Sequence, residues 1–310
     1  MRPGPSMLRR ILRTLAALVG LALTIGAGLA AYRTRAEAHR LLTNPMETRM
    51  RPTRHPGHFG MPYRSVTVTT PDGLSLAGWW VPSSNGAAVI TQHGYKSSRG
   101  EMLNEAALLY RRGYGVLLST IRAHDQSDGD LITFGRLEMD DLAAWYGFVR
   151  SEPSVDPARI GILGNSMGGT LAIQFAARTP GIAAVVAHSP FSSLADTLDT
   201  SVRFFTALPP FPFAPLIAFW AEREAGIRLE DVDARPWIAA LSPRPIFLLQ
   251  GGADVVVSPA GGQQLYDAAG EPRELWFDPK VGHAAFDGVR TGEYERRVAS
   301  FFDRYLLGVN

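Results

Sequence analysis

The sequence predicts an α/β fold with a mostly parallel central sheet, helices on both faces, a helical cap insertion, and one apolar helix ahead of the sheet. Two observations predict this architecture. From residue 63 onward, short apolar runs alternate with amphipathic stretches, which is the order of strands and helices in a doubly wound sheet. The 310 residues are 46% hydrophobic and 19% charged, which excludes a disordered chain and allows a core with a deep active site.

The N-terminal sequence predicts a basic segment over residues 1–13, followed by a transmembrane helix over residues 14–32. The 19 residues of this helix carry no charge, and as an α-helix they span about 28 Å, enough to cross a bilayer. Arginines flank both ends, so they do not orient the span. We expect a retained single-pass membrane anchor. The alternatives are a signal peptide cleaved near Gly28-Leu29-Ala30, which releases a secreted protein, and a buried helix of a soluble protein.

Residues 33–62 predict a juxtamembrane linker with one short helix at 35–42, because they are rich in Arg, His, Pro and Thr and show little apolar periodicity. Residues 1–64 carry eleven arginines and two glutamates, a net charge of +9. The remaining residues carry 20 basic and 27 acidic groups, a net charge of −7. The basic pI therefore comes from the N-terminal part, and the charge pattern indicates no nucleic-acid partner.

The globular domain is predicted over residues 63–310. It begins with an antiparallel hairpin around the turn Pro71-Asp72-Gly73. Apolar runs then predict buried parallel strands, and the stretches between them predict amphipathic helices. The hairpin strands are 64–70 and 74–81; the parallel strands are 87–92, 116–121, 160–163, 183–187, 245–250 and 273–277; the helices are 101–112, 136–151, 168–178, 259–269 and 292–307.

A stretch of about fifty residues, 191–241, breaks this alternation. Its middle is rich in aromatic residues and proline, and it is too long for a simple connection. We interpret it as a helical cap inserted over the sheet. Its aromatic side chains have three interpretations: they line an apolar acyl pocket, face a bilayer, or pack the cap on the sheet. These side chains are Phe204, Phe205, Phe211, Phe213, Phe219 and Trp220.

The segment Gly164-Asn165-Ser166-Met167-Gly168 follows a predicted strand and precedes a predicted helix. This G-x-S-x-G pattern is typical of a sharp strand-to-helix turn that presents a serine hydroxyl as a nucleophile. The chain contains no cysteine, so its nucleophile is an oxygen or a nitrogen. A serine needs a base to accept its proton, and that base needs a carboxylate to orient it.

His283 and Asp254 are the candidates for the base and the carboxylate. Each follows its own predicted strand, so each belongs at the carboxyl edge of the sheet together with Ser166. Asp278 and Asp287 are rival carboxylates, but both lie on the loop that carries the histidine. The chain order Ser, Asp, His is that of a serine hydrolase built on a parallel sheet.

An oxyanion hole requires two backbone N–H donors. We expect the first from Met167, directly after the serine, and the second from Tyr95, where Gly94 permits a sharp bend after a strand. His93, His124 and His188 are interpreted as packing residues.

With these motifs, residues 63–307 resemble the α/β-hydrolase family, in particular the bacterial membrane-anchored hydrolases of the serine-aminopeptidase-like and BEM46-like subgroup. The segment RAHDQSDG, residues 122–129, is similar to a conserved loop of that family but carries Ala123 and Asp125 where glycines are usual. The resemblance implies an α/β-hydrolase fold and a Ser–His–Asp hydrolase without a cofactor.

We expect the protein to be a membrane-anchored serine hydrolase that cleaves a carboxylester, a lipid-like ester or a thioester through an acyl-enzyme on Ser166. One alternative is a peptidase that holds a substrate amine with Glu222, Glu224 or Glu230. The other is a non-catalytic, membrane-tethered binding protein. The sequence indicates no metal site, and it has no phosphate-binding loop, because Lys96 follows Tyr95 where that loop requires glycine.

Overall fold

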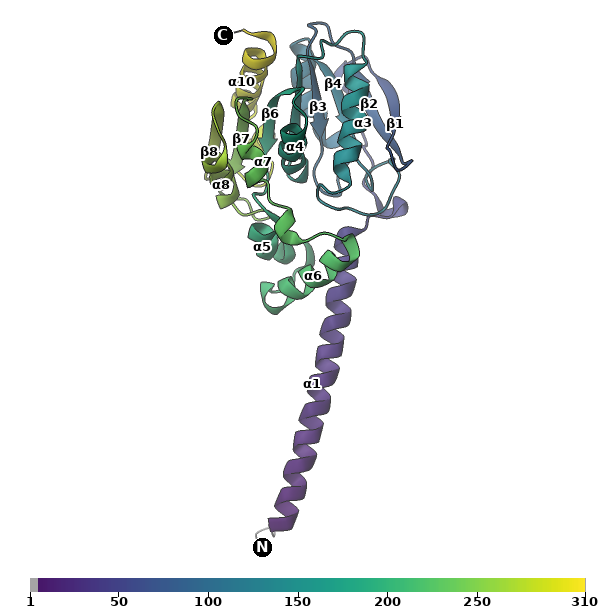
Figure 1. The fold of residues 1–310 in the computed structure, drawn as a ribbon, viewed down its shortest axis with the longest axis vertical. Helices are drawn as coiled ribbons and strands as arrows, with labels where there is room; N and C mark the ends of the chain where they lie inside the picture. The colour runs from purple at the N-terminus through teal and green to yellow at the C-terminus, as the bar shows by residue number, and fades with distance from the viewer. Residues whose placement is uncertain (1–4, 310) are drawn as a thin grey trace.

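The computed structural model describes residues 5–309, and its centre is one eight-stranded sheet (Figure 1). The strand order is β1-β2-β4-β3-β5-β6-β7-β8. β1 and β2 form the predicted antiparallel hairpin, β2 pairs antiparallel with β4, and all other pairs are parallel. All eight predicted strands are confirmed. Their bounds are β1 Arg64–Thr69, β2 Ser75–Val81, β3 Ala88–Gln92, β4 Gly115–Ser119, β5 Ile160–Asn165, β6 Ile182–His188, β7 Ile246–Gly251 and β8 Arg273–Asp278.

Helices cover both faces of this sheet, which confirms the predicted α/β class. On one face, α3 (Glu138–Arg150), α4 (Met167–Arg178), α7 (Arg235–Ala239) and α8 (Ala260–Ala268) enclose a core that includes Trp80 and Trp145. On the other face, α2 (Leu103–Arg111) and α10 (Thr291–Phe302) enclose a second core. The strands between the two cores are almost entirely buried, which explains why their sequences are apolar without alternation.

Besides α7 on the face of the sheet, the insertion at 191–241 contains two longer helices, α5 (Leu194–Thr206) and α6 (Pro210–Ala225), which bend by 100° relative to each other. The Ser193 side chain caps α5 by accepting a hydrogen bond from Asp196 N–H. Both helices lie at the end of the domain from which α1 projects (Figure 1). The insertion is therefore a helical cap, and it lies on the same side as the apolar helix.

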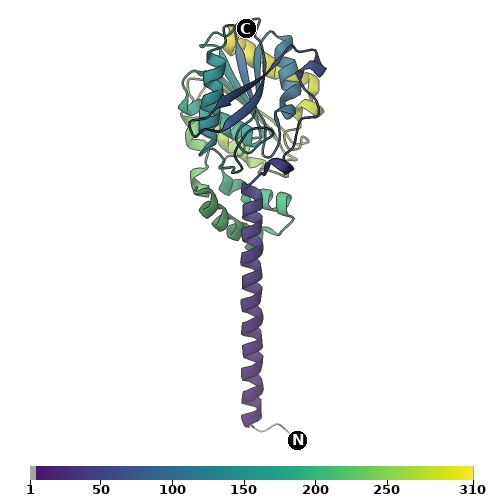
Figure 2. The same cartoon turned by 90° about the vertical axis from the view of Figure 1, so that its right-hand side faces the viewer.

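Helix α1 is continuous from Pro5 to Leu42 and projects away from the domain over most of its length (Figure 2). It contains the predicted span 14–32, whose side chains are nearly all exposed. Residues 7–42 are the one helix within the described residues that is long and apolar enough by itself to cross a bilayer. Residues 1–4 of the predicted basic segment lie outside the described residues.

The prediction of a linker over residues 33–62 requires correction, because this segment packs on the domain. The predicted helix 35–42 is the last part of α1, and its Ala38 is buried against Ala214 and Ile217 of the cap. The chain after α1 then pairs with residues 130–132, where Leu42 C=O accepts a hydrogen bond from Ile132 N–H (2.8 Å). These contacts fix the direction in which α1 leaves the domain.

The buried Arg49 side chain is the main contact of this segment. Its guanidinium donates hydrogen bonds to the carbonyls of Ser127 and Gly129 and to the Asp130 carboxylate. The basic composition of residues 33–62 predicts a solvated segment. Arg49 is nevertheless only 6% exposed, because it donates hydrogen bonds to backbone carbonyls of the loop 122–129.

Candidate active site

Ser166 occupies a strained turn between β5 and α4. Its backbone has φ 54° and ψ −120°, a region that a residue with a side chain rarely adopts, and its N–H donates to His188 C=O (2.8 Å). The glycines around it are required by close packing. A Cβ on Gly164 would lie 2.1 Å from Gly168 O, and one on Gly168 would lie 2.4 Å from Gln92 O. The turn therefore holds the Ser166 hydroxyl above the ends of the strands.

The structure brings Ser166, His283 and Asp254 together in one hydrogen-bonded relay. His283 Nε2 lies 2.8 Å from Ser166 Oγ, and His283 Nδ1 lies 2.7 Å from Asp254 Oδ2. The other carboxylate oxygen, Oδ1, accepts the N–H groups of Val256 (2.9 Å) and Val257 (3.0 Å). These two amides fix the carboxylate of Asp254, whose side chain is fully buried, and the carboxylate in turn orients the imidazole.

The rival carboxylates are bonded elsewhere. Asp278 accepts hydrogen bonds from the Lys280 N–H (2.9 Å) and from Arg290 (2.7 Å), and these, the Lys280 N–H first, hold the pKa of that carboxyl below its usual range. Asp287 accepts a hydrogen bond from Asn104 (3.0 Å). The loop that carries His283 is positioned by Ala284 N–H, which donates to Ser189 Oγ (3.0 Å).

The loop after β3 presents Tyr95 beside Ser166, with Gly94 close to the Ser166 Cβ. Gly94 N–H donates to Glu101 (3.1 Å) and Lys96 N–H donates to His124 Nε2 (3.0 Å). Between them, the Tyr95 N–H has no protein acceptor within residues 5–309, and the same holds for the Met167 N–H at the start of α4. These two amides are therefore available to a ligand.

The other histidines near the site are fully buried and pack the loops. His124 Nδ1 lies 2.7 Å from Arg122 C=O while its Nε2 accepts the Lys96 N–H, so the ring is neutral with its proton on Nδ1. Burial lowers the pKa of His93 and of His124. Burial, followed by the charge of His283, lowers the pKa of His188 to about 3. His124 thus supports the backbone beside Tyr95 as a neutral ring.

The loop 122–129 adopts left-handed backbone at both positions where the family resemblance leads one to expect glycine. Ala123 has φ 61° and Asp125 has φ 49°. Neighbouring contacts stabilise this backbone conformation. Arg99 pairs with the Asp125 carboxylate (3.0 Å), and Ala123 C=O accepts a hydrogen bond from Asn44 (2.7 Å). Ala123 and Asp125 therefore adopt the left-handed conformation that glycine adopts most easily.

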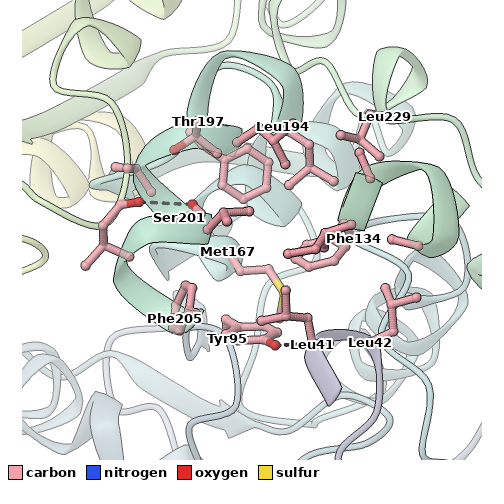
Figure 3. Close-up of a pocket in the computed structure, with 18 of the residues that line it drawn as sticks. Leu41, Leu42, Tyr95, Phe134, Met167, Leu194, Thr197, Ser201, Phe205 and Leu229 are labelled. Atoms are coloured by element: carbon pink, nitrogen blue, oxygen red, sulfur yellow. Dashed lines mark hydrogen bonds between the residues drawn. The ribbon is translucent and has the colours of Figure 1, made fainter. Parts of the chain in front are cut away.

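An apolar cavity of about 120 Å³ lies beside Ser166, between the sheet and the cap (Figure 3). Figure 3 shows Leu194 and Leu229 of the cap region on the side opposite Leu41 and Tyr95. No charged side chain lines this cavity within residues 5–309; Ser166, Tyr95, Thr197 and Ser201 are its polar residues, and the others are apolar.

Leu41 and Leu42 of α1 are part of this lining, and sequence reasoning missed them. The available signal was weak: they are an apolar pair at the end of the predicted helix 35–42. Among the cap aromatics, Phe205 lines the cavity, whereas Phe204, Phe211 and Phe219 are exposed. The remaining two, Phe213 and Trp220, pack with the cluster that joins α1 to the cap.

No group of three or more His, Cys, Asp or Glu side chains suited to a metal ion occurs within residues 5–309. The relay described above uses side chains and backbone amides alone.

Comparison with known proteins places this geometry in a family. The family model described as "Prolyl oligopeptidase family" matches residues 105–308, which include β5, the serine turn, the cap and the histidine loop. The chain belongs to the prolyl oligopeptidase family. It is thus an α/β-hydrolase enzyme, as the sequence motifs predicted.

Several known proteins are similar to most of this chain. The uncharacterized protein Rv2307c of Mycobacterium tuberculosis is 31% identical over 224 residues, which cover 71% of this chain and 72% of that protein. The uncharacterized protein YfhR of Escherichia coli K12 is 28% identical over 246 residues, covering 76% and 79%. Among solved structures, the Pyrococcus furiosus esterase Pf2001 superposes with a TM-score of 0.73 at 28% identity, covering 86% of this chain and 98% of the esterase.

Proposed function

We propose that this hydrolase is a membrane-anchored serine esterase that forms an acyl-enzyme on Ser166. The observation that carries the proposal is the continuous relay from Ser166 Oγ through His283 to Asp254 at the edge of an apolar cavity. A protein that only binds ligands has no need for this relay, which argues against the binding-protein alternative.

In the acylation step, Ser166 Oγ attacks the carbonyl carbon of the ester while His283 Nε2 accepts the hydroxyl proton. The N–H groups of Tyr95 and Met167 stabilise the oxyanion of the tetrahedral intermediate. The carbon–oxygen bond to the alcohol then breaks, and His283 returns its proton to the departing alcohol. The acyl group remains on Ser166.

In the deacylation step, water takes the place of the alcohol. His283 accepts a proton from the water as its oxygen attacks the acyl carbon, and the bond from that carbon to Ser166 Oγ breaks. Ser166 recovers its proton from His283, and the carboxylic acid leaves. Asp254 keeps its charge throughout and stabilises the imidazolium that forms in both steps.

The character of the cavity supports an ester over a peptide. A peptidase that holds a free amine requires a carboxylate in the cavity, but the three cap glutamates are bonded elsewhere. Glu222 accepts the Leu229 N–H (2.8 Å), Glu224 pairs with His39 (2.5 Å), and Glu230 pairs with Arg228. The esterase Pf2001, which matches this chain over 98% of its length, supports the same substrate class. Thioesters fit the same mechanism.

The properties of α1 support membrane anchoring. Its span 14–32 is apolar, uncharged and exposed along nearly all its length, and such a surface is stable in hydrocarbon and costly in water. Retention of this helix makes the enzyme a single-pass membrane protein.

A serine-directed fluorophosphonate probe tests the proposal. We expect the wild-type enzyme and a Ser151→Ala control, altered at an exposed serine, to be labelled, and Ser166→Ala to stay unlabelled. p-Nitrophenyl esters of increasing chain length and aminoacyl anilides then define the substrate class. Equal labelling of Ser166→Ala would refute the nucleophile, and turnover of anilides alone would refute the esterase assignment.

A further inference from the structure

We propose that the cap helices α5 and α6 lie in the surface of the bilayer that holds α1, and that the cavity beside Ser166 receives the acyl chain of a lipid ester from that bilayer. This inference rests on the proposed esterase function. It adds the source of the substrate and the surface through which the enzyme meets it.

Helix α1 sets the depth of the cap relative to the membrane. The side of α6 that carries Leu216 and Phe219 forms an open apolar groove with Ala27, Ala30 and Ala31 of α1. These alanines belong to the uncharged span that ends at Tyr32. At a rise of about 1.5 Å per residue, Ala27 lies about 7.5 Å inside that end. When the span crosses a bilayer, this side of α6 is therefore below the headgroups.

The outer surface of the cap is suited to that depth. Phe204 is 53% exposed, Phe211 is 84% exposed and Phe219 is 42% exposed. Together α5 and α6 are apolar enough to cross a bilayer by composition, but the 100° bend between them prevents a straight crossing. An apolar helix pair that cannot cross lies in the interface, with its apolar face a few ångströms into the acyl region.

A rim of basic and aromatic side chains lies on α1 and α6 at the point where the uncharged span of α1 ends. Tyr32, Arg35, Trp220 and Arg223 line an open hollow between α1 and α6, together with Ala36, His39 and Glu224. The Arg35 guanidinium lies 5.7 Å from the centre of the Trp220 ring. Tyrosine, tryptophan and arginine are the residues enriched at the level of lipid headgroups. Trp220 belongs to both this hollow and the apolar groove that contains Phe219, so the rim adjoins the groove.

Helix α6 connects this surface to the catalytic cavity. Leu216 and Phe219 face the groove at the bilayer, whereas Ala218 and Ala221 line the cavity beside Ser166. Leu41 of α1 lines the same cavity. Helix α6 therefore places apolar side chains both in the groove at the bilayer and in the cavity that would hold the acyl chain.

The proposal is tested on full-length enzyme reconstituted in phosphatidylcholine vesicles that contain a long-chain ester, with a soluble short-chain p-nitrophenyl ester as reference. We expect Phe204→Glu/Phe219→Glu to lower the ratio of the vesicle rate to the soluble rate at least tenfold. Val309→Glu is the matched control, since Val309 is 56% exposed and lies near the C-terminus, at the end of the domain opposite α1 (Figure 1).

An unchanged ratio in the double variant would overturn the lipid-facing assignment of the cap, as would an equal fall in Val309→Glu. Wild-type enzyme that hydrolyses soluble esters but not the vesicle ester would overturn the lipid source of the substrate and leave the esterase function intact. Wild-type enzyme without activity on either ester would contradict the proposed function itself.

A second measurement does not depend on catalysis. Lipids with brominated acyl chains quench a tryptophan that enters the bilayer, and Trp220 is the tryptophan beside the groove. Trp79, Trp80, Trp145 and Trp276 are buried in the domain, and the half-buried Trp237 packs against the core beside the sheet. We expect brominated vesicles to quench part of the wild-type fluorescence and Trp220→Phe to remove most of that quenching. Quenching that is absent, or undiminished in the variant, would overturn the position of α6.

Discussion

The two carboxylate oxygens of Asp254 have separate roles, and this makes one substitution informative. Asp254→Asn keeps an oxygen for the Val256 and Val257 amides but places an amide group against His283 Nδ1, which favours the wrong tautomer. We expect kcat to fall about 10³–10⁴-fold with little change in KM or in Tm. Steady-state kinetics and thermal unfolding measure both effects.

The matched control for this substitution is Asp287→Asn, on the histidine loop. Asp287 bonds to Asn104 and not to the relay, so kcat should stay within about twofold of wild type. A comparable loss of kcat in both variants would show that the effect comes from disturbing the loop and not from the relay.

Glu105 is a fully buried carboxyl whose Oε1 accepts the Tyr294 hydroxyl (3.1 Å). Burial, together with the charge of Asp287, raises its pKa from 4.5 to about 8. The unfolded chain therefore loses this proton at lower pH than the folded chain does, and the free energy of unfolding decreases as pH rises from about 4.5 to 8.

Glu105→Gln removes this titration and keeps an acceptor for Tyr294. We expect wild type to lose about 1–3 kcal/mol more stability than the variant between pH 5 and pH 8. Urea unfolding at the two pH values measures the difference. Parallel pH dependence in the two proteins would mean that Glu105 is ionised in the folded state.

Some residues of the candidate site could be predicted from the sequence, and others could not, because their position depends on packing between distant segments. Ser166, Asp254 and His283 each follow a parallel strand, and such strands end at one edge, so their meeting could be predicted. Leu41 and Leu42 lie far along the chain from every motif, and hydropathy shows only that they are apolar. Their place beside Ser166 depends on the packing of α1, which no local pattern encodes.

At the scale of elements, the last turn of α1 is bonded to both the Tyr95 loop and the cap. The Tyr95 hydroxyl donates to Leu41 C=O, Lys96 Nζ donates to Arg40 C=O (2.6 Å), and Arg40 donates to Phe205 C=O (2.8 Å). The end of the apolar helix is therefore a structural part of the site, although it was expected to be a linker.

Leu41→Trp tests this placement, because it fills part of the cavity and leaves the backbone carbonyl that Tyr95 bonds. We expect kcat/KM for a dodecanoyl ester to fall about tenfold relative to an acetyl ester, since one to two kcal/mol of acyl-chain contact is lost. Leu29→Trp, at an exposed position of the same helix, should leave this ratio unchanged. An unaltered chain-length profile in Leu41→Trp would exclude Leu41 from the acyl site.

Deletion of N-terminal residues tests how much residues 33–62 contribute to the stability of the domain. A fragment of residues 33–310 keeps Leu42, Asn44 and Arg49, whereas a fragment of residues 63–310 removes them and exposes the cavity. We expect the shorter fragment to be less stable by several kcal/mol, because Arg49 satisfies carbonyls of the loop 122–129 and Leu42 is buried. Thermal unfolding and soluble-ester turnover compare the two; equal Tm values would restore the interpretation of 33–62 as a linker.

The linker prediction failed because composition describes a segment and not its partners. Arginine-rich, proline-containing sequence is typical of solvated chain. Here Arg49 is buried because backbone carbonyls of the loop 122–129 accept its hydrogen bonds, and a sequence pattern does not show which carbonyls lack partners. The strands and covering helices were predictable because their apolar periodicity is itself the cause of their burial.

At the scale of the whole molecule, the charge is divided between a basic N-terminal part of +9 and an acidic remainder of −7. The basic part flanks and follows the apolar span, and Arg35 lines the hollow between α1 and the cap helix α6. The overall pI therefore averages two parts of opposite charge, and its basic value comes from the residues around the proposed membrane span.

The continuity of α1 and its groove with α6 favour our proposal of a retained anchor over a cleaved signal peptide. Cleavage after Ala30 would cut one unbroken helix at the position where Ala27, Ala30 and Ala31 form the groove with α6, and it would remove the span that sets the depth of the cap. We expect the enzyme from the membrane fraction to have the intact mass of the full chain and to stay with the membrane after an alkaline carbonate wash. Replacing Ala30 by Leu removes the small-x-small site and should leave the mass, the membrane fraction and the esterase activity as they were. A soluble product that begins near Ala31, and that disappears in Ala30→Leu, would establish the secreted form instead.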